Sequence, residues 1–253
     1  MNLDTLNLAI LGPAFLAGLL VLATHVPMGQ QVLQRGIVFI DLAIAQIAAL
    51  GVIAADALGW EPQGAAVQGA AFCAALLGAL LLTWTEKHWP EVQEAIIGGL
   101  FVLAASAGIL LLSNNPHGGE HLKDLLVGQI LWVSMSQLIS AMLLTAVILG
   151  LWFGFREKLG RTGFYIMFAL AVTTSVQLVG VYLVFSSLIM PALAVQKWPT
   201  SKRLKGGYMI GGVAYITGLA LSAIFDLPSG AVIVWCLAAT GLCFNLVRFG
   251  SQR

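Results

Sequence analysis

Charged residues are scarce in this sequence of 253 residues. Asp, Glu, Lys and Arg together make up 9%, whereas hydrophobic residues make up 59%. A soluble domain has about 25% charged residues, so this chain has too little polar surface to cover a body that faces water on all sides. Its net charge of +1 supplies no excess of positive charge for a nucleic acid. Composition therefore excludes a soluble domain and indicates no nucleic-acid partner.

Cysteine is also rare, and its positions argue against a disulfide framework. The three cysteines, Cys73, Cys236 and Cys243, each lie inside an apolar run. In that setting cysteine usually behaves as a small hydrophobic residue. We therefore expect buried, unpaired thiols that neither form disulfides nor bind metal.

The sequence has none of the common catalytic motifs: no HExxH, no G-x-S-x-G and no phosphate-binding P-loop. This predicts that the chain is not an enzyme and has no cofactor of its own. If ATP powers the protein, another subunit must bind the nucleotide.

Apolar runs of about 20 residues recur along the whole chain, and each can cross roughly 30 Å of hydrocarbon as a helix. This predicts an all-α polytopic membrane protein with a bundle of about 8–9 transmembrane helices, forming a single transmembrane domain over 1–253. No Lys or Arg precedes Arg35, so we expect the first run to be retained as a span rather than cleaved as a signal peptide. The expected spans are 6–26, 37–57, 64–84, 95–113, 130–154, 163–179, 180–196, 207–225 and 230–249.

Basic residues divide unequally between the two sides of this layout. Of the twelve Lys and Arg residues, only Lys123 falls on the side of the N-terminus, and the other eleven fall on the opposite side. The positive-inside rule then places the N-terminus outside and the C-terminus in the cytoplasm.

The second predicted span contains a carboxylate, Asp41, and an amide, Gln46, among apolar and small residues. A charge at the membrane centre costs at least ~2.5–3.5 kcal/mol, so it normally faces protein or water. Asp41 is either an interface carboxylate bonded to a neighbouring helix or a lining group of a cation path. Gln46 lies roughly 140° around a regular helix from Asp41, so the two do not share a face.

A second concentration of polar residues lies in the outer loop SNNPHGGEHLKD, 113–124. His117, Glu120 and His121 combine imidazole and carboxylate ligands, which suit zinc and similar divalent ions. The alternative interpretation is a solvated loop with two unremarkable histidines.

Five stretches together resemble the membrane permeases of bacterial ABC importers for zinc, manganese and iron. They are VLQRGIVFIDLAIAQIAALGVI (32–53), EAIIGGLFVLAASAGILLLS (94–113), DLLVGQILWVS (124–134), QLVGVYLVFSSLIMPALAV (177–195) and DLPSGAVIV (226–234). Their order and spacing carry the resemblance, which runs over most of the chain. Two departures stand out. A gapless match places Gln46 where the family has a metal-contacting His, and Leu42 where it has the partner Asp, with Asp41 one place earlier. The cytoplasmic stretch before the sixth span is also short, at 156–163.

The resemblance implies a permease subunit of an importer for a divalent metal ion or a metal complex, in a bacterial plasma membrane. It implies three partners: cytoplasmic ATPase subunits, an extracytoplasmic metal-binding protein and a second copy of the permease. Asp41, Gln46, His117, Glu120 and His121 are the candidate metal contacts. The alternative is an ATPase-independent facilitator or scaffold that retains the fold.

Overall fold

The computed structural model describes residues 8–60, 64–112 and 126–250, and the described part is a bundle of helices. They are α1 (Leu8–Arg35), α2 (Ile40–Ala57), α3 (Ala65–His88), α4 (Gln93–Leu112), α6 (Met135–Val179), α7 (Val181–Ala194), α8 (Thr200–Phe225) and α9 (Ser229–Gly250), with short 3-10 turns η2 (Pro90–Val92) and η3 (Ile130–Trp132). Seven segments are long and apolar enough to cross a membrane, and two shorter apolar helices, Val181–Ala194 and Ser229–Phe244, accompany them. The predicted all-α membrane fold is confirmed.

Helix α6 contains two crossing segments rather than one. It begins with a reciprocal cap, in which the Gln137 backbone N–H donates to Ser134 Oγ at 3.3 Å and the Ser134 N–H donates to Gln137 Oε1 at 2.9 Å. Its backbone is non-helical at Phe155 and at Gly160, where φ is 56°. The segments on either side, Met135–Phe155 and Gly160–Val179, are each of spanning length. The predicted short connection at 156–163 therefore coincides with this reversal.

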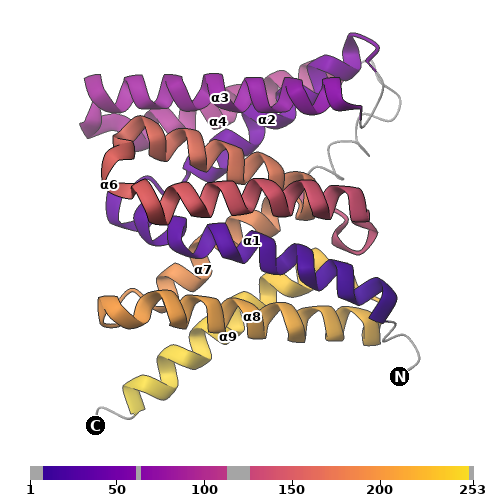
Figure 1. Cartoon of the computed structure of the whole chain (residues 1–253), viewed down its shortest axis with the longest axis vertical. Coiled ribbons are helices and arrows are strands. Elements are labelled where there is room, and N and C mark those ends of the chain that lie inside the picture. The colour runs from indigo at the N-terminus through magenta and orange to yellow at the C-terminus, as the bar shows by residue number, and fades with distance from the viewer. Residues whose placement is uncertain (1–7, 61–63, 113–125, 251–253) are drawn as a thin grey trace.

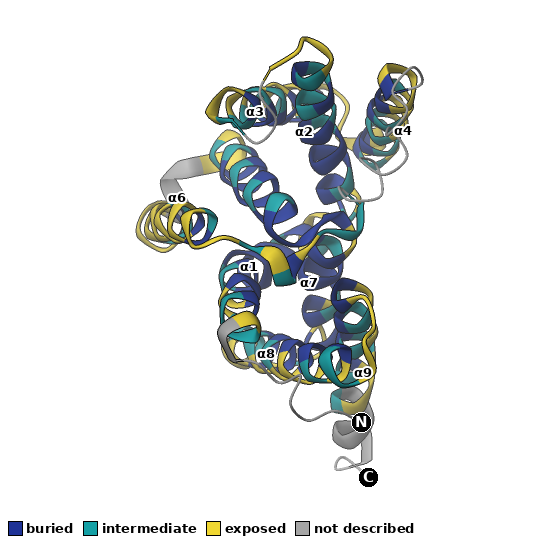
Figure 2. Cartoon of the chain, turned by 90° about the vertical axis from the view of Figure 1, so that its right-hand side faces the viewer, coloured by how far each residue is buried: buried dark blue, intermediate teal, exposed yellow. Residues whose placement is uncertain are grey.

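The helices form two groups that meet at α1, α6 and α7 (Figures 1 and 2). In one group α2 packs against α3 and α4, and α3 packs against α6; in the other α8 and α9 pack against each other and against α7. Figure 1 shows α1 running from right to left and the α6 reversal at the left. The left side is therefore the predicted cytoplasmic end, and it collects the ends of α1, α3 and α7 and the starts of α2, α4 and α8.

Helix α1 is longer than predicted, because it continues past Pro27 to Arg35 instead of ending at residue 26. A proline has no N–H, so the carbonyl four residues earlier loses its helical partner. Here that carbonyl belongs to Ala23, and the Tyr208 hydroxyl of α8 donates a hydrogen bond to it at 3.0 Å. A side chain from another helix thus replaces the missing bond, and α1 continues.

We expect Tyr208→Phe to destabilise the bundle because it leaves the Ala23 carbonyl without a donor. The cost should be about 1–3 kcal/mol, the usual penalty for an unsatisfied buried polar group. Reversible unfolding of the purified full chain in mixed micelles would measure it. Tyr182→Phe is the matched control, because Tyr182 is 54% exposed and should tolerate the same change. Equal stability of the two variants would contradict this account of α1.

Large apolar side chains cover much of the outer surface of the bundle. Leu110, Trp132 and Trp235 are 73%, 82% and 78% exposed in the isolated chain, as expected of positions that face lipid. The expectation of buried cysteines was wrong: Cys73 and Cys243 are exposed and Cys236 is partly exposed. Lipid and protein core favour the same apolar residue types, so sequence alone cannot separate the two environments.

Two glycines allow backbones to cross at the outer end of the bundle. Gly180 has φ 82° at the turn between α6 and α7, and Gly128, in the segment before η3, has φ 68°. A Cβ added at Gly128 would overlap the backbone of Val179, and one added at Gly180 would overlap the backbone of Gly128. The predicted division of spans six and seven within QLVGVYLV therefore falls at Gly180, where only a glycine fits.

Candidate functional site

Asp41 lies in the first turn of α2 and is fully buried. Neither of its carboxylate oxygens has a hydrogen-bond partner. The positive end of the helix dipole favours a carboxylate at this position, but it supplies far less than the hydration that burial removes. The protein therefore keeps a costly polar group at the predicted cytoplasmic end of α2.

Gln46 is also buried, with 7% of its surface exposed. No hydrogen bond joins it to Asp41, since both oxygens of Asp41 are unpartnered, so the structure does not assemble the two into a pair. Both are covered because α2 has neighbours on several sides, namely α3, α4, α6 and α7. The prediction that they lie on different faces of α2 agrees with this arrangement.

Small residues let α3 approach α2 closely. A Cβ added at Gly51 would lie 2.8 Å from the Ala70 carbonyl oxygen and 2.8 Å from the Ala74 Cβ, and one at Gly78 would lie 2.9 Å from Ile47 Cδ1. Close backbone approach is the usual way helices pack in lipid. The predicted position of α2 inside the bundle follows from this packing.

A second carboxylate reaches the start of α2 from another helix. Glu94, in the first turn of α4, accepts a hydrogen bond through Oε1 from the backbone N–H of Phe39 at 3.2 Å. Its other oxygen, Oε2, is buried without a hydrogen-bond partner. Phe39 precedes α2 and has no side-chain cap of its own, so Glu94 supplies the cap. The N-terminus of α2 therefore receives carboxylates from both α2 and α4.

The same end of this helix group carries a polar cluster made of Arg35, Glu86, Gln93 and Tyr165. Arg35 Nη1 lies 3.9 Å from Glu86 Oε1. Gln93 Nε2 donates to the Tyr165 hydroxyl at 3.3 Å and to the Leu82 carbonyl at 3.0 Å. Arg35 and Glu86 lie in the last turns of α1 and α3, and Gln93 begins α4. Tyr165 lies in the part of α6 that follows the reversal, so the cluster joins four helices.

Arg35 is also held by an aromatic ring. Its guanidinium carbon lies 4.3 Å from the centroid of the Phe164 ring, a separation at which a cation is attracted to the ring face. Arg35 therefore has two partners, the carboxylate of Glu86 and the ring of Phe164. The sequence analysis did not select Glu86, Gln93 or Tyr165. The available signal near them was Glu94, the acidic residue that begins the stretch 94–113.

His25 is a further buried polar residue that sequence reasoning left without a role. It is fully buried in α1. Its Nδ1 lies 2.9 Å from the Val21 carbonyl oxygen, which can only accept, so Nδ1 carries the proton. Nε2 then presents a lone pair, and it has no hydrogen-bond partner. His25 and Asp41 lie on different helices and share no hydrogen bond.

The predicted outer-loop contacts His117, Glu120 and His121 lie outside the described residues. Within residues 8–60, 64–112 and 126–250, no group of three or more His, Cys, Asp or Glu side chains is placed to hold a metal ion. At the start of α2 the described part brings two carboxylates, the buried one of Asp41 and the capping one of Glu94. Such an arrangement suits brief attraction more than tight coordination, which needs three or four ligands.

Comparisons with known proteins agree with the fold of a helical membrane protein. The family model of the ABC 3 transport family matches residues 7–164 and 153–247. The chain is 24% identical to the high-affinity zinc uptake system membrane protein ZnuB of Haemophilus influenzae, covering 96% of this chain and 98% of that protein. It is 26% identical to the manganese transport system membrane protein MntC of Halalkalibacterium halodurans, with coverage of 98% and 89%.

The fold also matches a solved structure, PsaBC from Streptococcus pneumoniae in complex with Fab. The TM-score is 0.74 at 22% sequence identity, covering 92% of this chain and 90% of that one. At this identity the likeness shows the fold, while the family model carries the assignment. The chain therefore belongs to the ABC 3 transport family and is a multi-pass permease of the bacterial inner membrane.

Proposed function

We propose that this chain is the permease subunit of an ABC importer whose substrate is a divalent metal ion, zinc, manganese or iron, or a complex of such an ion. The observation that carries the proposal is Asp41, a fully buried carboxylate without a hydrogen-bond partner inside the bundle. Ionisable groups in membrane spans are costly and usually mark the route of an ion. The similarity to zinc and manganese transport proteins supports a metal cation as that ion.

ATP acts through partner subunits in this proposal. The sequence contains no P-loop, so cytoplasmic ATPase subunits bind and hydrolyse the nucleotide, and this chain performs no covalent chemistry and has no cofactor. An extracytoplasmic binding protein delivers the metal, and a second copy of the permease completes the path between the two chains. Family membership supports this assembly, and no observation favours an ATPase-independent facilitator or a scaffold.

The candidate contacts then act in sequence along the path. His117, Glu120 and His121 capture the ion weakly on the outer side. Gln46 offers a carbonyl oxygen within the bundle, and Asp41 attracts the ion to the predicted cytoplasmic end of α2. A single carboxylate with an amide holds a divalent ion less firmly than a carboxylate–imidazole pair, which suits release into the cell.

Uptake of radioactive zinc, manganese and iron by a deletion strain tests the function. We expect the strain to lose uptake of one of these ions at limiting concentration and to regain it when the chain is supplied on a plasmid. The partner ATPase must be active: a variant unable to hydrolyse ATP should abolish the restored uptake. Uptake that persists with the inactive ATPase would instead establish the facilitator. Replacing His117, Glu120 and His121 together by alanine should reduce uptake only at limiting metal.

A further inference from the structure

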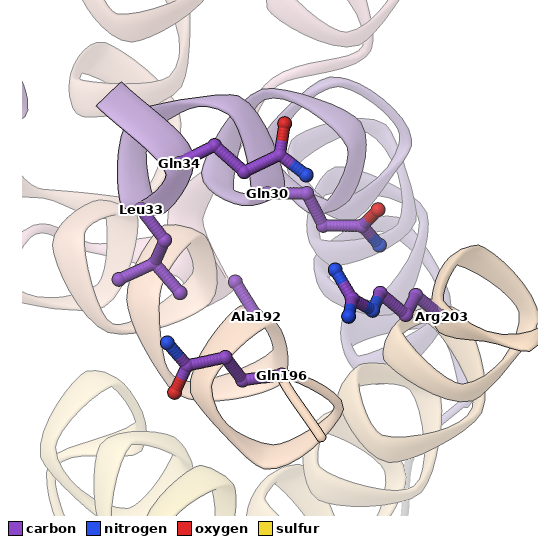
Figure 3. Close-up of a pocket in the computed structure, with 6 residues that line it drawn as sticks. All are labelled: Gln30, Leu33, Gln34, Ala192, Gln196 and Arg203. Carbon is purple, nitrogen blue, oxygen red and sulfur yellow. The ribbon is translucent and has the colours of Figure 1, made fainter. Parts of the chain in front are cut away.

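A pocket of about 300 Å³ opens at the predicted cytoplasmic end between α1, α7 and α8, and Asp41 is not among its lining residues. Figure 3 shows side chains from all three helices around it. Its lining consists of four polar and two apolar residues: Gln30, Gln34, Gln196, Arg203, Leu33 and Ala192. The lining contains no carboxylate, so its single formal charge is the positive charge of Arg203.

The guanidinium of Arg203 and the amide of Gln30 lie near each other at the pocket (Figure 3). Arg203 donates from Nε to the Trp198 carbonyl oxygen at 2.8 Å, which fixes the plane of the guanidinium and leaves its terminal nitrogens directed into the pocket (Figure 3). Gln30 Nε2 is buried without a hydrogen-bond partner, although an amide N–H can donate. A buried donor without an acceptor costs about 1–3 kcal/mol. An anion in the pocket would supply the missing acceptor.

The sequence on both sides of the α7–α8 connection carries charge of one sign. The sequence has no Asp or Glu between Lys158 and Phe225, whereas Lys197, Lys202, Arg203 and Lys205 lie in the α7–α8 connection and the first turns of α8. The acidic residues of the predicted cytoplasmic end whose side chains the structure describes, Asp41, Glu86, Glu91 and Glu94, belong to the other helix group. The first turns of α8 therefore carry Lys202, Arg203 and Lys205, with no carboxylate in the same stretch of sequence.

We propose that this pocket binds the phosphate of an anionic phospholipid of the cytoplasmic leaflet. The guanidinium fork of Arg203 matches phosphate oxygens bidentately, and the amide of Gln30 donates to the same group. Basic pockets between transmembrane helices on the cytoplasmic side take up such headgroups. The lining comes from the last turns of α1 and α7 and the first turns of α8, at headgroup depth, and Leu33 gives the glycerol an apolar wall. This site is independent of metal transport.

Native mass spectrometry of the purified full chain, titrated with phosphatidylglycerol or phosphatidylcholine, tests the proposal. We expect the first phosphatidylglycerol to bind at least about tenfold more tightly than phosphatidylcholine, since the fork makes charge-assisted bonds. Arg203→Gln should remove that preference. The matched control is Lys202→Gln, which removes the same charge from the neighbouring exposed residue and should keep the preference. Gln30→Leu leaves Arg203 in place and should reduce the preference partly.

Four results would overturn the proposal. Wild-type chain could bind the two lipids equally. Lys202→Gln could lose phosphatidylglycerol as fully as Arg203→Gln, which would indicate diffuse surface charge. Inorganic phosphate at millimolar concentration could displace phosphatidylglycerol, which would assign the pocket to a soluble phosphate. The partner ATPase, added to the chain, could also displace phosphatidylglycerol, which would assign the pocket to an acidic protein surface. If Arg203→Gln fails to fold, an unchanged preference in Gln30→Leu overturns the proposal.

Discussion

Replacing Asp41 by Asn should abolish most metal uptake and leave the chain at least as stable as the wild type. Asn keeps the size of the side chain and removes the group that can carry negative charge. Uptake should fall at least about tenfold, since loss of a charge that attracts a divalent ion weakens its binding by more than about 1.4 kcal/mol. Stability should not fall, because the Asp41 oxygens make no hydrogen bond that the change could break. Uptake by a complemented deletion strain, with thermal unfolding of the purified protein, measures both effects.

Two further variants separate transport from folding at this site. Asp41→Leu removes the buried polar group altogether, and we expect it to raise the unfolding temperature while uptake stays low. Glu94→Gln removes the neighbouring charge but keeps an oxygen that can accept from the Phe39 N–H, so its loss of uptake should be smaller. Normal uptake by a correctly assembled Asp41→Asn protein would show that Asp41 is only an interface residue.

Replacing Gly128 by Ala should prevent most of the chain from reaching its folded state. The new Cβ would overlap the Val179 backbone, and φ at this position is 68°. A strained left-handed residue costs about 1–3 kcal/mol, and overpacking adds about 1–3 kcal/mol. Together these come to about 2–6 kcal/mol, which reaches the lower end of the stability of many domains, about 5–15 kcal/mol. The yield of monodisperse protein from membranes should therefore fall sharply.

Gly98→Ala is the control for this substitution. Gly98 lies inside α4, and a Cβ there meets nothing within 4 Å, so alanine should be neutral or slightly stabilising. Gly180→Ala should resemble Gly128→Ala, because its Cβ would overlap the other side of the same backbone crossing. Equal yields of Gly128→Ala and Gly98→Ala would contradict the prediction, because they would show that the Val179 backbone can shift to make room for the new Cβ.

Sequence predicted most of the helical layout because apolar run length, charge and glycine positions are local signals. The division at Gly180 and the position of α2 inside the bundle both came from such signals. What sequence could not supply were contacts between distant residues. The end of α1 at Arg35 depends on Tyr208, which lies 185 residues from Ala23, and the cap on α2 depends on Glu94, which lies 55 residues from Phe39.

For the same reason, sequence predicted one buried residue of the candidate site and missed the cluster of polar residues near it. Asp41 stood out because a carboxylate is rare in an apolar run, and the structure shows that it is buried and unpartnered. Glu86, Gln93 and Tyr165 are ordinary residues near helix ends in the sequence. They become a cluster only when the ends of α3, α4 and α6 meet. The metal roles of Asp41, Gln46 and the outer-loop residues remain predictions.

The bond from Tyr208 to Ala23 also bears on how the protein is made. A ribosome adds roughly 5–20 residues per second, so about 10–40 s separate the synthesis of Ala23 from that of Tyr208, 185 residues later. Throughout this interval α1 lies in the membrane, and the Ala23 carbonyl, which Pro27 leaves without a helical donor, does not yet have its bond from Tyr208. The first helix to be inserted is thus completed by one of the last, and a chain truncated before α8 would retain an unfinished α1 that quality-control proteases can recognise.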